Sequence, residues 1–216
     1  MIGTQENHMQ DKFLIFVALL FSGELIAGTL TDPRDGQTYR TVKIGGLEWM
    51  AENLNFKTED SFDDKIVSVC YYGNPKMCEL YGRLYTPGAG AKACPSGWHL
   101  PSYDEFNSLT EAAGGNDVAG RTLRARSDLW DDGQVGTDDL GFAALPGGAD
   151  VLGMDYTDTH TGKFAGFLGA EPAIIEDIDG NVVDTLPSYL GIWYDCDHLV
   201  DGNPFLELFS IRCVKD

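Results

Sequence analysis

The chain has 216 residues, of which 43% are hydrophobic and 11% aromatic, so it can build one sizeable core and does not resemble a disordered protein. It carries 34 acidic residues against 15 basic ones, and its formal net charge is −19. A surface this acidic repels phosphate groups, which argues against a nucleic-acid-binding protein and against direct adhesion to anionic lipid.

One strongly apolar segment, residues 13–21, lies near the N-terminus. It is too short to cross a bilayer as a helix, which takes about 20 residues. Lys12 precedes it and small residues follow it, an arrangement typical of a signal peptide. We therefore predict a signal peptide at residues 1–28 and a single exported domain at 29–216, with no direct membrane insertion. The alternative is a buried N-terminal segment of a cytoplasmic protein.

The first part of the predicted domain has the features of short strands. Hydrophobic and polar residues alternate between positions 39 and 49 around a Gly-Gly turn, which predicts a two-stranded hairpin. Residues 56–69 are polar and are predicted as a loop. Further short strands are predicted at 70–72 and 81–85.

The clearest predicted helix begins near Ser102. Pro101 precedes this serine, and Glu105 follows it at the spacing of a capping box. The helix should end at Gly114, and a second short helix is predicted from Asp117 to Arg126.

Beyond these helices the chain is rich in Gly and Asp, with short apolar segments between the loops. Strands are predicted at 142–145, 164–168, 189–194 and 205–214. Together these elements predict a compact α+β domain with few helices and long loops.

Five fragments in chain order carry a family resemblance: DGQTYRTVKIGGLEWMAENLNF (35–56), CELYGRLYT (78–86), ACPSGWHLPSYDEFNSL (93–109), GFAALPGG (141–148) and FSIRCVKD (209–216). Together they resemble the Fibrobacter succinogenes major paralogous domain, over roughly residues 32–216. This resemblance implies a bacterial protein that is secreted or displayed on the cell surface. The relatives usually carry a Trp-Ser-Ser-Thr-like stretch before their final strands, where this chain reads GFLGA at 166–170.

The segment GWHLPSYDEF is also similar to a motif of formylglycine-generating enzymes and other domains of C-type-lectin-like fold. This similarity implies a C-type-lectin-like α+β fold with small antiparallel sheets, one or two helices and long loops.

Five cysteines lie outside the predicted signal peptide, and none forms a Cys-x-x-Cys pair. In an exported protein, disulfides are the default expectation. The lectin-like arrangement brings the two ends of the domain together, so the resemblance implies a Cys94–Cys213 bridge. Cys70 and Cys78 would close a small loop. Cys196 would then be a free thiol or pair between chains.

Calcium is a cofactor that the sequence leaves open. Sugar-binding C-type lectins use Glu-Pro-Asn and Trp-Asn-Asp triplets, and this chain reads EPA at 171–173 and WYD at 193–195, without either asparagine. Calcium takes about six to eight oxygen ligands, which nearby side chains could supply. The candidate ligands are Glu171, Glu176, Asp177, Asp179, Asn181 and Asp195. A tight Asp-Gly turn with solvated carboxylates is the alternative.

Aromatic residues in the late loops are candidates to face a ligand, because exposed rings stack on sugars and anchor protein interfaces. The candidates are Trp130, Tyr189, Trp193 and Tyr194. Core packing is the alternative for each of them.

No serine-hydrolase, zinc-protease or phosphate-loop motif is present, and we expect no enzymatic activity. The sequence predicts a binding or display module whose loops at 57–69, 128–140 and 149–204 contact a protein or glycan partner at the bacterial surface. One alternative is a calcium-dependent glycan-binding protein. Another is an oxidase like the formylglycine-generating enzymes, which would need reduced, reactive cysteines and copper.

Overall fold

The computed structural model describes residues 28–61, 63–150, 160–200 and 206–216. The predicted signal peptide lies outside the described residues except for Gly28, the first residue of the first strand. Among the residues that are described, no helix is long and apolar enough to cross a membrane.

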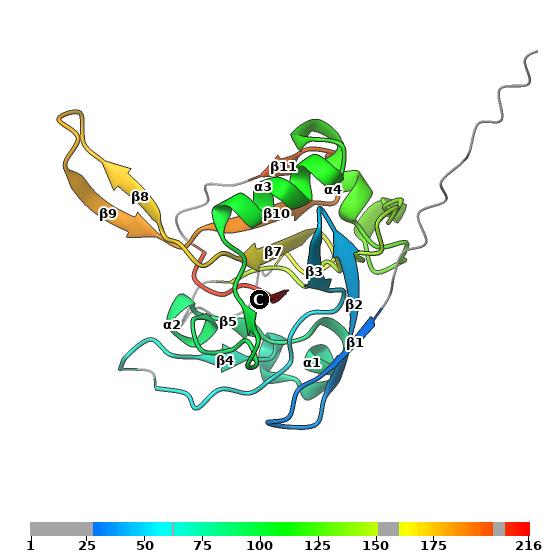
Figure 1. Ribbon diagram of the computed structural model, residues 1–216, viewed down its shortest axis with the longest axis horizontal. Coiled ribbons are helices and arrows are strands. Elements are labelled where there is room, and N and C mark those ends of the chain that lie inside the picture. The colour runs from blue at the N-terminus through cyan, green and yellow to red at the C-terminus, as the bar shows by residue number, and fades with distance from the viewer. Residues whose placement is uncertain (1–27, 62, 151–159, 201–205) are drawn as a thin grey trace, which may run out of the picture.

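The largest sheet has five antiparallel strands in the order β1-β2-β3-β12-β6 (Figure 1). Its strands are β1 (Gly28–Thr31), β2 (Thr38–Ile44), β3 (Leu47–Met50), β6 (Trp98–His99) and β12 (Val214–Lys215). The predicted β2–β3 hairpin is confirmed, and both glycines of its turn have the positive φ that glycine adopts without strain. In the last strand, Val214 pairs with Trp49 on one side and with His99 on the other.

A second sheet has three antiparallel strands in the order β11-β10-β7. Its strands are β7 (Phe164–Leu168), β10 (Tyr189–Trp193) and β11 (Leu199–Val200), so the strands predicted at 164–168 and 189–194 are confirmed. Two-stranded sheets pair β4 (Ser68–Val69) with β5 (Leu84–Tyr85), and β8 (Ala173–Glu176) with β9 (Val182–Leu186).

Several predictions about loops and strands were wrong. The region 149–204 was predicted as a long loop apart from the strands at 164–168 and 189–194, but it also contains β8, β9 and β11. Residues 151–159 and 201–204 lie outside the described part. The segment 142–145 forms only an isolated bridge from Ala144 to Arg124. Phe205 is not described. The rest of the segment predicted as a strand to 214 makes isolated bridges before it reaches β12.

Four α-helices are present among the described residues: α1 (Pro75–Tyr81), α2 (Pro87–Gly90), α3 (Tyr103–Ala112) and α4 (Asn116–Leu123). The predicted capping box of α3 is confirmed, and Ser102 and Glu105 each accept the other's backbone N–H. The second predicted helix is confirmed as α4. It ends at Leu123 rather than at 126, because the next residue is extended and forms the bridge to Ala144.

The predicted strand at 70–72 is wrong, because residues Tyr71–Gly73 form a 3-10 turn, η1. A second such turn, η2, spans Asp131–Gly133. After η1, the side chain of Asn74 caps α1, and Pro75 occupies the first turn of that helix, where its missing N–H costs nothing.

Aromatic rings join the two main sheets and α3 into one core. Trp49 of β3 lies 6.1 Å from Phe106 of α3 and 6.0 Å from Phe142, measured between ring centroids. Phe142 in turn contacts Phe167 of β7 edge-on at 5.4 Å. The predicted α+β class is confirmed. The meeting of β1 and β12 in one sheet agrees with the C-type-lectin-like layout.

A buried arginine lies at the centre of this core. Arg212 is fully buried, and its guanidinium donates to the Asn53 side chain at 2.8 Å and to the carbonyl oxygens of Phe142 and Ala143. Its Cζ also lies 4.6 Å from the Phe142 ring centroid. Burial lowers the pKa of Arg212 to about 9, so the side chain is still charged at neutral pH.

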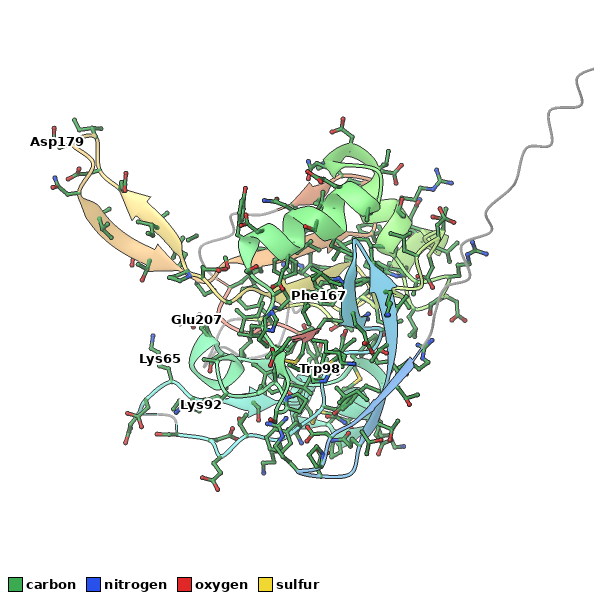
Figure 2. The ribbon with its side chains drawn as sticks, viewed as in Figure 1. Lys65, Lys92, Trp98, Phe167, Asp179 and Glu207 are labelled. Atoms are coloured by element: carbon green, nitrogen blue, oxygen red, sulfur yellow. A yellow bond between two sulfur atoms is a disulfide. The ribbon has the colours of Figure 1, made fainter. Side chains whose placement is uncertain are left out.

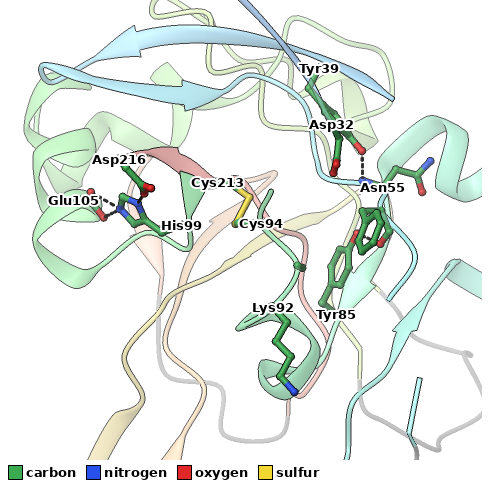
Figure 3. The surroundings of a disulfide bond; sticks show 12 residues. Asp32, Tyr39, Asn55, Tyr85, Lys92, Cys94, His99, Glu105, Cys213 and Asp216 are labelled. Carbon is green, nitrogen blue, oxygen red and sulfur yellow. Dashed lines mark hydrogen bonds and ion pairs between the residues drawn. A yellow bond between two sulfur atoms is a disulfide. The ribbon is translucent and has the colours of Figure 1, made fainter. Parts of the chain in front are cut away.

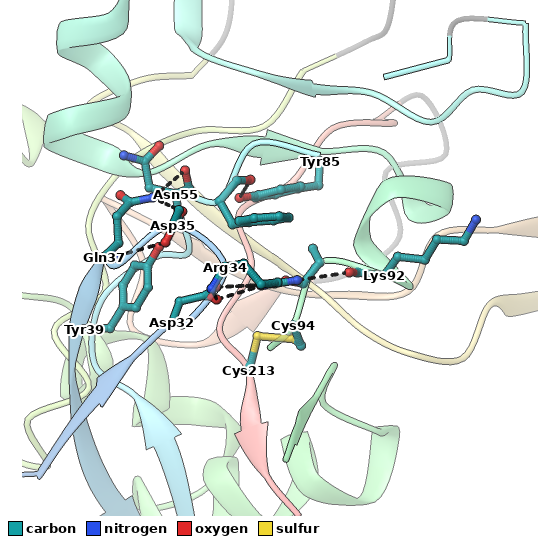
Figure 4. A network of polar contacts seen from close by, with 12 residues as sticks. Asp32, Arg34, Asp35, Gln37, Tyr39, Asn55, Tyr85, Lys92, Cys94 and Cys213 are labelled. Carbon is teal, nitrogen blue, oxygen red and sulfur yellow. Dashed lines mark hydrogen bonds and ion pairs between the residues drawn. A yellow bond between two sulfur atoms is a disulfide. The ribbon is translucent and has the colours of Figure 1, made fainter. Parts of the chain in front are cut away.

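A second arginine fastens the N-terminal hairpin to the body (Figure 4). Arg34 forms an ion pair with the buried carboxylate of Asp32 at 2.6 Å and donates to the carbonyl oxygen of Ala93 at 2.6 Å. Its Cζ lies 3.7 Å from the centroid of the Phe56 ring. Burial alone would raise the pKa of Asp32, but the hydrogen bonds and charge of Arg34 bring it below its ordinary value. The turn before β2 is therefore held next to the Cys94–Cys213 bridge.

Candidate functional site

Strands β8 and β9 form a hairpin that projects away from the rest of the domain (Figure 1). We call residues 171–188 the arm. All four residues of β8 and four of the five residues of β9 are exposed. Figure 2 places Asp179 at the far end of the arm, well away from the core residue Phe167.

The arm exposes aliphatic side chains that usually lie in a protein core. These are Ile174, Ile175, Ile178, Val182 and Val183, whose exposed fractions range from 40% for Ile175 to 102% for Ile178. Consecutive residues of a strand point to opposite faces, and Ile174 and Ile175 are both exposed. Both faces of the hairpin are therefore uncovered. Exposed apolar surface of this kind makes the arm a candidate interaction site.

The turn of the arm is built by the carboxylate of Asp177. Its Oδ1 accepts the backbone N–H groups of Asp179 and Asn181, each at 2.9 Å, and the Asn181 side chain donates to it as well. These hydrogen bonds lower the pKa of Asp177. Gly180 completes the turn with a φ of +80°. The acidic run therefore forms a tight Asp-Gly turn, as in the alternative to a calcium loop.

The base of the arm is bonded to the start of α3. Glu171 accepts the N–H of Tyr103 at 3.0 Å, and the N–H of Ala170 donates to the carbonyl oxygen of Pro101 at 2.8 Å. The N–H of Gly169 donates to the carbonyl oxygen of Ser188 at 2.9 Å, which closes the base across its two strands. A Cβ at Gly169 would lie 2.5 Å from the Ser188 hydroxyl, so any larger residue here would displace that side chain.

A histidine with two carboxylate partners links the start of α3 to the C-terminal residue Asp216 (Figure 3). His99 Nε2 lies 2.9 Å from Glu105, the capping-box residue, and His99 Nδ1 lies 2.7 Å from the side chain of Asp216. Burial alone would lower the pKa of His99, but the hydrogen bonds to Asp216 and Glu105 raise it above its ordinary value. The base of the arm therefore contacts the start of α3, which His99 links to β6 and to Asp216, the residue after β12.

The raised pKa of His99 makes the stability of this base depend on pH. A folded-state pKa above the unfolded value adds stability that is complete below about pH 6.5 and is lost as pH rises through the folded value. Because the side chains are partly exposed, solvent screens the pairs, and we expect less than about 1 kcal/mol. We predict that His99→Gln unfolds at a lower temperature than the wild type at pH 5.5, and that the gap closes by pH 9. A gap that is constant across this range would contradict the assignment. Thermal unfolding followed by circular dichroism measures it.

The structure does not assemble the predicted calcium ligands. Glu171 lies at the base of the arm and bonds to α3, whereas Asp177, Asp179 and Asn181 lie at its turn. Asp195 lies beyond the far end of β10, the strand that begins where the arm ends. Within the described ranges no group of three or more His, Cys, Asp or Glu side chains could hold a metal ion. Glu176 lies between these groups, on β8.

The aromatic candidates pack against the core. Trp130 was wrongly predicted to face a ligand, because it is buried and its indole N–H donates to the Ala144 carbonyl at 3.2 Å. Tyr189 is half-buried and stacks on Phe209 with centroids 4.8 Å apart, and the half-buried Trp193 lies 5.0 Å from Phe164. Tyr194 is half-buried against the cluster that contains Trp49.

Both expected disulfides are present. Cys70 bonds Cys78 across 8 positions, and Cys94 bonds Cys213 across 119. Cys196 is the free thiol. Burial raises the pKa of Cys196, and the charge of Asp195 adds to this effect, so the thiol is protonated at neutral pH and is a poor nucleophile.

The arm was not among the predicted elements. The signal was present: β-branched pairs at 174–175 and 182–183 flank an Asp-Gly dipeptide, a pattern typical of a hairpin. The same acidic residues suggested calcium ligands, and that interpretation obscured the strand pattern on either side of them.

The fold and the arm together define a disulfide-bridged α+β domain that presents one exposed hairpin. The family described as the Fibrobacter succinogenes major domain matches residues 42–170, more than half of the chain. The chain belongs to this family. No curated protein and no solved structure matches it.

Proposed function

We propose that this protein is an exported, non-enzymatic binding module that contacts a protein partner through the arm. The observation that carries the proposal is the exposure of aliphatic side chains on both faces of β8–β9. An isolated two-stranded hairpin is only marginally stable in water, so a projecting arm with apolar faces gains stability when a partner covers it.

The composition of the arm favours a protein partner over a glycan. Residues 171–188 contain no aromatic side chain, and aromatic faces are what sugar rings stack on. The four aromatic residues that were predicted to face a ligand are buried or half-buried in packing contacts: Trp130, Tyr189, Trp193 and Tyr194.

The two disulfides support export, because such bridges persist in oxidising compartments. They also occupy four of the five cysteines, which leaves the oxidase alternative without the thiol pair that it requires. The calcium-dependent glycan-binding alternative lacks an assembled ligand set within the described residues. A place outside the cell, secreted or at the bacterial surface, follows as part of the proposal.

Binding of the fluorescently labelled protein to the producing cells tests the proposal. We predict saturable binding that is lost when the cells are treated with protease. The variant Ile174→Ser/Ile175→Ser/Val183→Ser should bind about 10-fold more weakly or worse, because these side chains form the exposed apolar surface.

The matched control is Val118→Ser/Val135→Ser, which changes exposed valines outside the arm and should bind as the wild type does. Both variants should retain the wild-type unfolding temperature to within a few degrees. Binding that survives protease but is lost after periodate oxidation of glycans would overturn the assignment of a protein partner. Equal binding by the arm variant would overturn the role of the arm.

A further inference from the structure

We propose that the free edge of β8 accepts an extended, basic segment of the partner as an added strand. This inference rests on the proposed function and specifies the chemistry of the partner. It rests on two features of the same hairpin: a strand edge that is unpaired and charged side chains that are all negative.

The outer edge of β8 presents backbone N–H and C=O groups with which another strand could pair. Within the described part of the chain, β8 pairs with β9 alone. The N–H of Asp177 donates to the carbonyl oxygen of Asn181, so this residue faces the neighbouring strand. Backbone groups alternate sides along a strand, and those of Ile174 and Glu176 therefore point outward.

The outer edge of β9 is less suited to pairing with an added strand. The register shift between Ile175 and Glu176 skips one residue of β9, so the bulge lies on β9 and β8 remains regular. β8 also contains no proline, since Pro172 precedes it. A regular edge with exposed β-branched side chains is the kind of template to which an extended peptide adds a strand.

Charge determines which peptide fits. The arm carries five carboxylates, at Glu171, Glu176, Asp177, Asp179 and Asp184, and no Lys or Arg. A second copy of this chain would bring like charges together on the paired arms, within a molecule of net charge −19. A cation opposite Glu176 on the added strand would instead make a favourable cross-strand pair, and the other carboxylates of the arm would add to the attraction at longer range. The partner segment is therefore apolar on alternate positions and basic on the others.

Short synthetic peptides test this inference on the full protein. One peptide alternates Val with Lys, the second alternates Val with Glu, and the third is the Lys peptide with alternate backbone amides N-methylated. We expect the Lys peptide to bind at least about 10-fold more tightly than the Glu peptide, by an amount that falls with added salt. It should also slow hydrogen exchange at the amides of Ile174 and Glu176. N-methylation should abolish both effects, because it removes the ladder donors.

A charge reversal provides the matched comparison. Glu176→Lys/Asp184→Lys should now prefer the Glu peptide. Glu59→Lys/Glu111→Lys makes the same change of net charge at exposed sites outside the arm and should keep the wild-type preference.

Several outcomes would overturn the inference. These are equal binding of the Lys and Glu peptides, no exchange protection in β8, or arm-dependent self-association seen by sedimentation. If arm variants lose cell binding while the Lys peptide leaves β8 unprotected, strand addition fails and the proposed function stands. If the Lys peptide protects β8 but arm variants bind cells normally, the proposed function fails instead.

Discussion

Replacing Arg212 with Ala is expected to lower the free energy of unfolding by about 3 to 5 kcal/mol. The guanidinium is fully buried and donates to the side chain of Asn53 and to the carbonyl oxygens of Phe142 and Ala143. Its removal leaves these acceptors buried without donors and opens a cavity beside the rings of Phe142 and Phe167. Urea unfolding followed by tryptophan fluorescence measures the loss.

Two further variants separate the causes. Arg212→Met keeps most of the side-chain volume but none of the donors, so its cost should reflect the unpaired carbonyl groups rather than the cavity. Arg40→Ala removes an arginine that forms an exposed ion pair with Glu52 and should cost less than about 1 kcal/mol. If Arg212→Ala cost no more than Arg40→Ala, the central role of the buried arginine would be wrong.

Removal of the Cys94–Cys213 bridge should destabilise the domain about twice as much as removal of the Cys70–Cys78 bridge. The chain-entropy model gives about 5 kcal/mol for a loop closed across 119 positions and about 2.5 kcal/mol for one closed across 8. The comparison uses Cys94→Ala/Cys213→Ala and Cys70→Ala/Cys78→Ala, unfolded in urea without reductant.

Cys196→Ala is the control, since this thiol is not bridged and its loss should change stability by less than about 1 kcal/mol. Alkylation of the unfolded, unreduced protein should add one label to the wild type and none to this variant. Equal destabilisation by the two double variants would argue against loop length as the source of the difference.

Local signals in the sequence were sufficient for some of the regular elements. The capping box at Ser102, the Gly-Gly turn before Leu47 and the apolar segment at 164–168 each specify an element with no long-range information, and all three predictions are confirmed. Helix α1 was not predicted, because its Asn-Pro start lies inside the short loop that Cys70 and Cys78 close.

The burial of Arg212 in the core could not be predicted from local signals. Residues 211–214 are all buried, so the expected alternation of buried and exposed positions fails there, and an arginine in such a segment looks like a surface residue. Trp130 is similar: its neighbours in the sequence are acidic, and its burial depends on Ala144, which a distant segment supplies. Tertiary contacts determine both positions.

The exposed position of the arm could not be predicted for a different reason. Its hairpin pattern is local and visible, but the projection from the body depends on bonds between its base and α3. Periodicity predicts that a strand has an apolar face, and it does not predict whether anything covers that face. The candidate site therefore became visible only in three dimensions.

The position of β12 has a consequence for how the chain folds. This strand joins β3 to β6, and Val214 pairs with Trp49 from the other end of the domain. Such distant pairing raises contact order, which slows folding. The five-stranded sheet cannot be completed, nor the Cys94–Cys213 bridge formed, before residues 213–215 have left the ribosome. Most of the domain therefore leaves the ribosome before its core can be completed, and its apolar residues stay without their final packing partners until the last strand has been synthesised.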